Sequence, residues 1–205
     1  ILFTMLVILM FIINGGQSLV VSLSMPLVFL ATLGLMKVSG MALDLVTLSA
    51  LILSIGFVVD DAIVVVENIN SKRSEGMDMR EAAIEGTAEV AMPSIAGAST
   101  TLIVLVPLLF IEGFVGEMFR PLSLTLIYAI SASVLVALLM IPLLSVLLSR
   151  LKMKRLEGWV LKVARPFNHW MSRLLDSYLS LNRLALAHRT WTFALLGVFL
   201  VGSGL

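Results

Sequence analysis

Two adjacent acidic residues, Asp60 and Asp61, interrupt a long apolar run and are the side chains best suited to chemistry. The run from Leu45 to Val66 otherwise contains no charged residue. Its length predicts a membrane-spanning helix, and an ionised acid near the centre of such a helix costs about 2.5 to 3.5 kcal/mol. A neutral apolar pair would be more stable there, so the two acids indicate a function rather than a structural role.

No basic residue of this sequence lies at the depth of the two aspartates. The lysines and arginines between Ile1 and Ser149 stand at or beyond the ends of the predicted spans: Lys37, Lys72, Arg73, Arg80 and Arg120. Either the carboxylates are protonated at rest, or a cation reaches them from helices outside this sequence. Both alternatives suit a group that binds and releases a proton while a transporter alternates its access.

The spacing of the two acids limits what they can do together. Adjacent helix positions point about 100° apart, so both carboxylates can face one interior wedge but cannot oppose each other across a gap. This weighs against an intramembrane aspartyl protease, whose two acids must flank a peptide bond from different helices. The pair is therefore better suited to proton transfer than to hydrolysis.

Small and hydroxyl-bearing residues near the pair are candidates for supporting it. Gly56 on the same helix would allow close packing, and Ser99, Thr100 and Thr101 on the next helix could donate hydrogen bonds to a buried carboxylate. Packing of small residues alone is the alternative for these four. Glu67 lies nearly on the face of Asp60 toward the cytoplasm, and is either an exit relay for the proton or an interfacial acid.

The composition is that of a membrane chain. Of 205 residues, 60% are hydrophobic and 13% charged, with 14 basic against 13 acidic side chains. Near-neutral charge gives no basic field for nucleic acid, and the absence of cysteine excludes disulfides, thiolate metal sites and thiol catalysis. The two histidines, His169 and His188, stand in a basic polar stretch without further ligands. We expect no metal site, no cofactor and no enzymatic activity.

The apolar runs predict an all-α, polytopic helical bundle in a membrane. Complete spans are expected at 19–36, 45–66, 90–111 and 121–149, with the end of another span at 1–13 and the start of a further one at 190–205. Three segments are expected between them: a connector at 67–89, a short loop at 112–120 and basic amphipathic helices at 150–189. Within the connector, Asp78 and Glu81 resemble an N-cap pair that opens a short helix through Glu89. Because both chain ends lie inside apolar runs, we expect a fragment of a longer protein.

Basic residues collect on one side of the predicted membrane. Only Lys37 and Arg120, of 14 lysines and arginines, fall on the other side when successive helices alternate in direction. The positive-inside rule therefore places 67–89 and 150–189 in the cytoplasm and 112–120 on the opposite side of the membrane, which would be the periplasm in a bacterium with two membranes. The segment 150–189 is expected to lie in the cytoplasmic membrane interface, with docking onto a partner domain as the alternative.

The acidic pair stands in the string Gly56-Phe57-Val58-Val59-Asp60-Asp61-Ala62-Ile63-Val64-Val65-Val66-Glu67-Asn68. This string resembles the fourth-helix signature of resistance-nodulation-division (RND) transporters, specifically the hydrophobe and amphiphile multidrug efflux branch. Pro107 and the loop from Glu112 to Pro121 agree with that family. The resemblance covers essentially the whole chain, from the end of transmembrane helix 2 to the start of helix 7.

The resemblance implies a proton/drug antiporter of the bacterial inner membrane, in which the aspartates matching Asp60 and Asp61 carry the proton. It implies that a buried lysine in the second half of the same polypeptide pairs with them. It further implies a homotrimer that engages a periplasmic adaptor and an outer-membrane channel. The drug path would run through periplasmic domains outside this sequence.

Two other functions stay open within the same superfamily. One is a metal-exporting branch, although the 12 methionines are scattered and form no clear pair inside a span. The other is a sterol-sensing-type lipid transporter or receptor. The chain by itself, as half of a bundle, is expected to have no independent activity.

Overall fold

The computed structural model of the chain describes residues 15–150, together with residues 173, 177–180, 182, 186, 197, 198 and 202. The described residues of the second compact unit, Leu161–Leu205, are helical. The predicted span end at 1–13, nearly all of the amphipathic segment 150–189 and most of the span start at 190–205 lie outside the described residues. His169 and His188 lie outside them as well.

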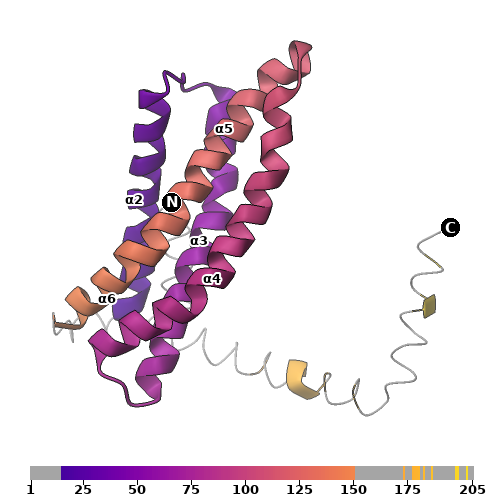
Figure 1. Cartoon of the computed structure of the whole chain (residues 1–205). Coiled ribbons are helices and arrows are strands. Elements are labelled where there is room, and N and C mark those ends of the chain that lie inside the picture. Colours follow the sequence, from indigo (N-terminus) through magenta and orange to yellow (C-terminus); the bar gives the residue numbers. More distant parts are fainter. Residues whose placement is uncertain are drawn as a thin grey trace. The chain divides into compact units, whose positions relative to one another are not determined.

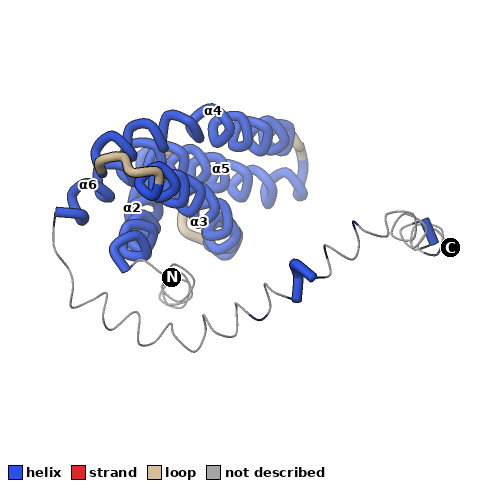
Figure 2. The backbone as a smooth tube through the Cα atoms, turned by 90° about the horizontal axis from the view of Figure 1, so that it is seen from below, coloured by secondary structure: helices blue, strands red, loops and turns tan. Residues whose placement is uncertain are grey.

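Residues 15–150 form antiparallel helices joined by short loops, with no strand among them (Figures 1 and 2). The elements are α2 (Gly15–Val38), α3 (Leu45–Ser74), α4 (Met79–Leu105), the 3₁₀ helix η1 (Val106–Phe110), α5 (Gly113–Leu135), the π-helix η2 (Val136–Met140) and α6 (Ile141–Arg150). Four helical segments are long and apolar enough to cross a membrane, the number predicted: Leu19–Val38, Leu45–Ser74, Met79–Phe110 and Gly113–Ser149.

The helices extend beyond the apolar runs that predicted them. Helix α3 continues through Ser74, and the short helix expected up to Glu89 is continuous with the next span in α4, so most of the predicted connector 67–89 is helical. Helix α5 starts at Gly113, so the predicted loop 112–120 is helical except for its first residue. Helix ends follow capping rather than hydropathy, because a helix can continue through polar residues wherever its hydrogen-bond ladder is satisfied.

The start of α3 is fixed by a capping box. The Asp44 carboxylate accepts a hydrogen bond from the Thr47 backbone N–H at 2.8 Å, and Thr47 Oγ1 accepts one from the Asp44 N–H at 2.9 Å. The hydrogen bond from the Thr47 backbone holds the pKa of Asp44 below its ordinary value. Asp78 caps α4 in the same position, as its place before Glu81 predicted, although its carboxylate accepts from Arg80 N at 3.4 Å.

Helix α3 is the central element, because it contacts α2, α4, α5, η2 and α6. The main core joins α2 and α3 through side chains such as Val21, Met25, Val65 and Ile69. Buried positions also hold many small polar residues: Ser22, Ser24, Thr32, Thr47, Ser54, Thr87, Ser123, Thr125, Ser133 and Ser145. Large apolar side chains such as Leu30 and Ile52 are exposed instead. Small polar residues inside and apolar residues outside are typical of a helix bundle in lipid.

A π turn separates α5 from α6. In η2 the Ile141 N–H donates to the Val136 carbonyl, five residues back, instead of four as in an α-helix. Pro142 follows directly, and proline has no N–H to donate and crowds the carbonyl four residues before it. The long helical segment therefore changes its register just after Leu135.

The ends of α3 and α4 next to their connecting turn are held by polar contacts. The Asn68 side-chain amide donates to the Gly86 carbonyl at 2.7 Å and to Glu89 at 3.2 Å. Lys72 pairs with Glu89 at 3.1 Å and with Glu85 at 4.0 Å. This end of the bundle lies opposite the α2–α3 and α4–α5 turns (Figure 1).

Candidate functional site

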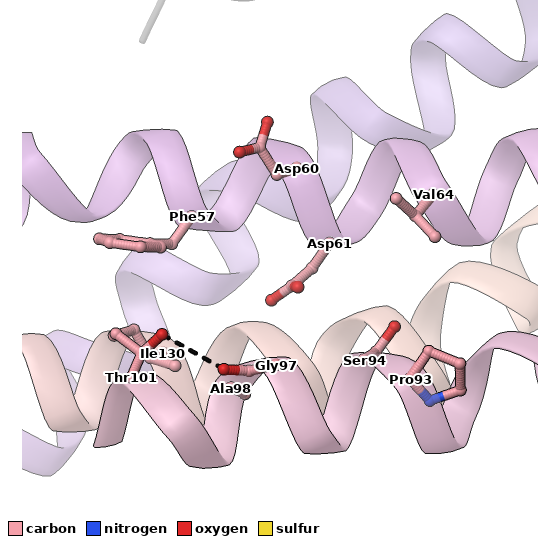
Figure 3. A pocket seen from close by; sticks show the side chains of 10 residues that line it. All are labelled: Phe57, Asp60, Asp61, Val64, Pro93, Ser94, Gly97, Ala98, Thr101 and Ile130. Atoms are coloured by element: carbon pink, nitrogen blue, oxygen red, sulfur yellow. Dashed lines mark hydrogen bonds between the residues drawn. The ribbon is translucent and has the colours of Figure 1, made fainter. Parts of the chain in front are cut away.

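Asp60 and Asp61 lie midway along α3 and line one pocket of about 300 Å³ (Figure 3). The walls of the pocket come from α3, α4 and α5: Phe57, Asp60, Asp61, Val64, Pro93, Ser94, Gly97, Ala98, Thr101 and Ile130. Apart from the two aspartates, none of these side chains carries a charge. Both acids contribute to the lining of one pocket, but their side chains point in different directions, so a shared orientation of the two carboxylates remains a prediction.

The two carboxylates have different surroundings. Asp61 is half-buried and points toward α4, whereas Asp60 is exposed and points away from it (Figure 3). Asp61 Oδ2 accepts a hydrogen bond of 2.8 Å from the hydroxyl of Ser133 on α5. Asp60 has no hydrogen bond to another side chain among the described residues. The pair is therefore asymmetric, because only Asp61 is hydrogen-bonded to another helix of the described bundle.

No cation compensates the pair within residues 15–150. The ion pairs of this part of the chain join Lys72 to Glu85 and Glu89, at the end of the bundle. Lys37 is in the last turn of α2, and Arg120 donates from Nε to the Leu109 carbonyl at 3.1 Å. The two alternatives from the sequence, a protonated carboxylate or a cation from elsewhere, thus apply unchanged to the folded chain.

Of the predicted supporting residues, Thr101 lines the pocket, and its hydroxyl donates to the Gly97 carbonyl of its own helix at 3.2 Å. The others lie outside the pocket wall. Gly56 is exposed, and a Cβ atom there would meet nothing within 4 Å, so it mediates no close packing between described residues. Thr100 donates its hydroxyl to the Gly97 carbonyl of its own helix at 2.7 Å, and Ser99 does not line the pocket. The expectation that Ser99 and Thr100 donate to a carboxylate is therefore wrong for this structure. Glu67 is exposed and lies outside the pocket wall.

The sequence reasoning missed Ser133, which is 1% exposed and supplies the hydrogen bond expected from α4. In the sequence, Ser133 is marked only as a polar residue in an otherwise apolar span, and several other serines of this chain have the same surroundings. Pro93 and Gly97 were missed as well, although both line the α4 wall of the pocket. Gly97 has no side chain to fill the pocket, and Pro93 has no backbone N–H. Within the described residues, no three His, Cys, Asp or Glu side chains gather as metal ligands would.

The sequence matches the family model described as the AcrB/AcrD/AcrF family over residues 1–205. Similar curated proteins carry the name multidrug resistance protein MdtC. The protein from Proteus mirabilis (strain HI4320) is 31% identical over 196 residues, which cover 96% of this chain and 18% of that protein. The protein from Pectobacterium carotovorum subsp. carotovorum (strain PC1) is 32% identical over 191 residues, covering 93% of this chain and 18% of its own length.

A solved structure of a heavy metal efflux pump has the same fold in this region. Its TM-score is 0.61 at 22% sequence identity, and the match covers 72% of this chain and 15% of that one. This chain thus spans less than a fifth of the relatives that it matches.

Proposed function

Because this chain belongs to the AcrB/AcrD/AcrF family of RND transporters, we propose that the whole protein is a proton-driven efflux antiporter in which Asp60 and Asp61 carry the coupling proton. The proposal is based on the pocket beside the middle of the membrane-spanning helix α3. Two acids line this pocket, and none of the described residues that line it is a cation. A pair of acids in such a place has little other use, because structural carboxylates in a span are costly.

The proposed cycle uses the change of charge at the pair. A proton that enters from the periplasmic side binds a carboxylate oxygen and neutralises it, which removes the cost of desolvating the charge. The helices around α3 can then repack, and the proton leaves to the cytoplasmic side when the pocket opens there. A buried lysine from another part of the same polypeptide would pair with the ionised state and be released by protonation.

Amphiphilic organic compounds are the substrates that we propose, since the similar curated proteins carry a multidrug resistance name. Metal ions are the alternative, and the similarity to a heavy metal efflux pump concerns the fold alone. We place the protein in the bacterial inner membrane as a homotrimer, together with a periplasmic adaptor and an outer-membrane channel. Protons are the coupling ion, and no other cofactor is required by this scheme.

The test uses the full native polypeptide in cells that lack their own efflux pumps, with ethidium as the probe. Asp61→Asn and Asp60→Asn should each reduce uncoupler-sensitive efflux to the level of cells without the protein, because an amide cannot exchange a proton. Glu117→Gln is the matched control, since Glu117 is exposed and lies outside the pocket. Immunoblots of the membrane fraction check that the variants are inserted.

Retained efflux in both aspartate variants would contradict the proton role of the pair. Resistance to heavy-metal ions without efflux of ethidium would favour the metal-exporting alternative.

A further inference from the structure

The hydroxyl of Ser133 differs from the other hydrogen-bonded hydroxyls buried in this bundle. Those in helix interiors donate to a carbonyl of their own helix, as in the bonds from Ser24 to Val21, Thr32 to Val28, Ser54 to Leu51 and Thr125 to Pro121. Ser133 instead donates across the bundle to Asp61, which is 72 residues away in the sequence. Buried serine and threonine hydroxyls in this bundle can therefore donate to a carbonyl of their own helix. Ser133 donates to the Asp61 carboxylate instead.

Ser133 lies next to the π-helix η2, so its hydrogen bond to Asp61 is made close to an irregular part of the helix backbone. Ser133 stands three residues before η2, and its carbonyl shares the Val136 N–H with the carbonyl of Ala132. The backbone of α5 changes its register at this point, from α to π hydrogen bonding. A hydrogen bond at such a position links the charge of Asp61 to the segment of α5 whose hydrogen bonds are least regular.

Among the described residues, few charged groups lie close enough to Asp61 to affect its protonation. Asp60 is the titratable group beside it on α3, and the pocket wall on α4 and α5 carries none. The other described titratable groups of the packed helices lie outside the pocket wall: Lys37 in the last turn of α2, Arg80, Glu81, Glu85 and Glu89 in the first half of α4, Glu117 and Arg120 near the start of α5, Tyr128 bonded to Ser39, and Arg150 at the end of α6.

We propose that Ser133 is a positioning residue that makes the two carboxylates unequal, by stabilising the ionised form of Asp61 and fixing the pH at which it takes up a proton. This inference rests on the proposed function. When Asp61 is ionised, the Ser133 hydroxyl donates to Oδ2. When the carboxyl becomes protonated, that bond weakens, because a neutral acceptor attracts the hydroxyl less. Ser133 can then return to a carbonyl of its own helix, as the other buried hydroxyls do.

The test measures the infrared carbonyl band of the protonated carboxyl group as a function of pH, in the purified full polypeptide. The band of Asp61 is the one that Asp61→Asn removes, and its detection requires no substrate. Ser133→Ala should move its midpoint to higher pH by about one unit, because a hydrogen bond to the ionised form is lost. Ser133→Thr keeps the donor and should stay near the wild-type midpoint, and Ser133→Cys, a weaker donor, should fall between.

Ser123→Ala is the matched control. Ser123 is on the same helix and fully buried, but its hydroxyl has no hydrogen-bond partner among the described residues, so the midpoint should not move. An unchanged midpoint in Ser133→Ala and Ser133→Cys would overturn the inference and leave the proposed function intact, as would an equal shift in Ser123→Ala. If Asp61→Asn removes no titrating band, the proton role of Asp61 fails, and the inference fails with it.

Discussion

The Cα atom of Ile69 lies 2.9 Å from the point that a Cβ atom on Gly86 would occupy. The backbones of α3 and α4 therefore meet at this position, close to the bond from Asn68 to the Gly86 carbonyl. Because the contact is between backbones, no side chain can move to make room. Gly86 thus sets the distance between the two helices that form most of the pocket.

Gly86→Ala should destabilise the protein by about 1–3 kcal/mol, because the added methyl group overpacks this contact. Gly34→Ala is the control: Gly34 is a helical glycine with nothing within 4 Å of its Cβ position. That variant should be neutral or up to about 1 kcal/mol more stable. Thermal unfolding of the full polypeptide in detergent, followed by circular dichroism, measures both. Equal effects of the two substitutions would show that α3 and α4 are not in backbone contact.

Asn68→Leu should weaken the association of the α3 and α4 ends by about 0.5–1.5 kcal/mol, through loss of the hydrogen bond to Gly86. Asn70→Leu is the matched substitution two residues along the same helix. Both asparagines are half-buried, but Asn70 makes no side-chain hydrogen bond to another described residue. The protection of α4 amides from hydrogen exchange should fall in the first variant alone. If Asn70→Leu lowers protection equally, the bond to Gly86 contributes nothing.

Much of this architecture follows from the sequence, because hydropathy counts the spans and the cost of buried charge singles out Asp60 and Asp61. The ends of α3 and α5 do not follow from it, since Lys72 and Glu117 are polar residues on helices that continue past the apolar run. The hydrogen bond from Ser133 to Asp61 could not be predicted from the sequence either. It joins residues far apart in sequence, and only the packing of α3 on α5 decides which serine meets the carboxylate.

The capping box at the start of α3 predicts a specific pH response. The hydrogen bond from the Thr47 backbone lowers the pKa of Asp44 in the folded protein, so its contribution to stability is fully present above the unfolded pKa of about 3.9. The contribution is lost as the pH falls from there through the lower folded pKa. The Thr47 amide resonance should therefore titrate with a midpoint below that of an unperturbed aspartate. Asp44→Asn keeps the cap and should abolish this titration, while a midpoint at or above the ordinary value would refute the assignment.

The orientation of the bundle can be tested with single cysteines, since the sequence contains none. In a full polypeptide without other cysteines, Ala42→Cys in the α2–α3 turn should react with a membrane-impermeant maleimide in intact cells. Glu75→Cys in the α3–α4 turn should react only after the membrane is opened, because the basic residues place that end in the cytoplasm. Labelling of the two positions in the opposite order would reverse the predicted topology.

Coupling of transport to proton movement through Asp61 is tested most directly by measuring proton flux driven by substrate. The full polypeptide is reconstituted into liposomes with an internal pH indicator, and an ethidium gradient is imposed in the absence of any initial pH difference. We predict that ethidium moving down its gradient drives protons the opposite way, and that Asp61→Asn abolishes this proton movement. Ethidium transport by the wild type without a change in internal pH, or an undiminished change in Asp61→Asn, would contradict coupling through Asp61.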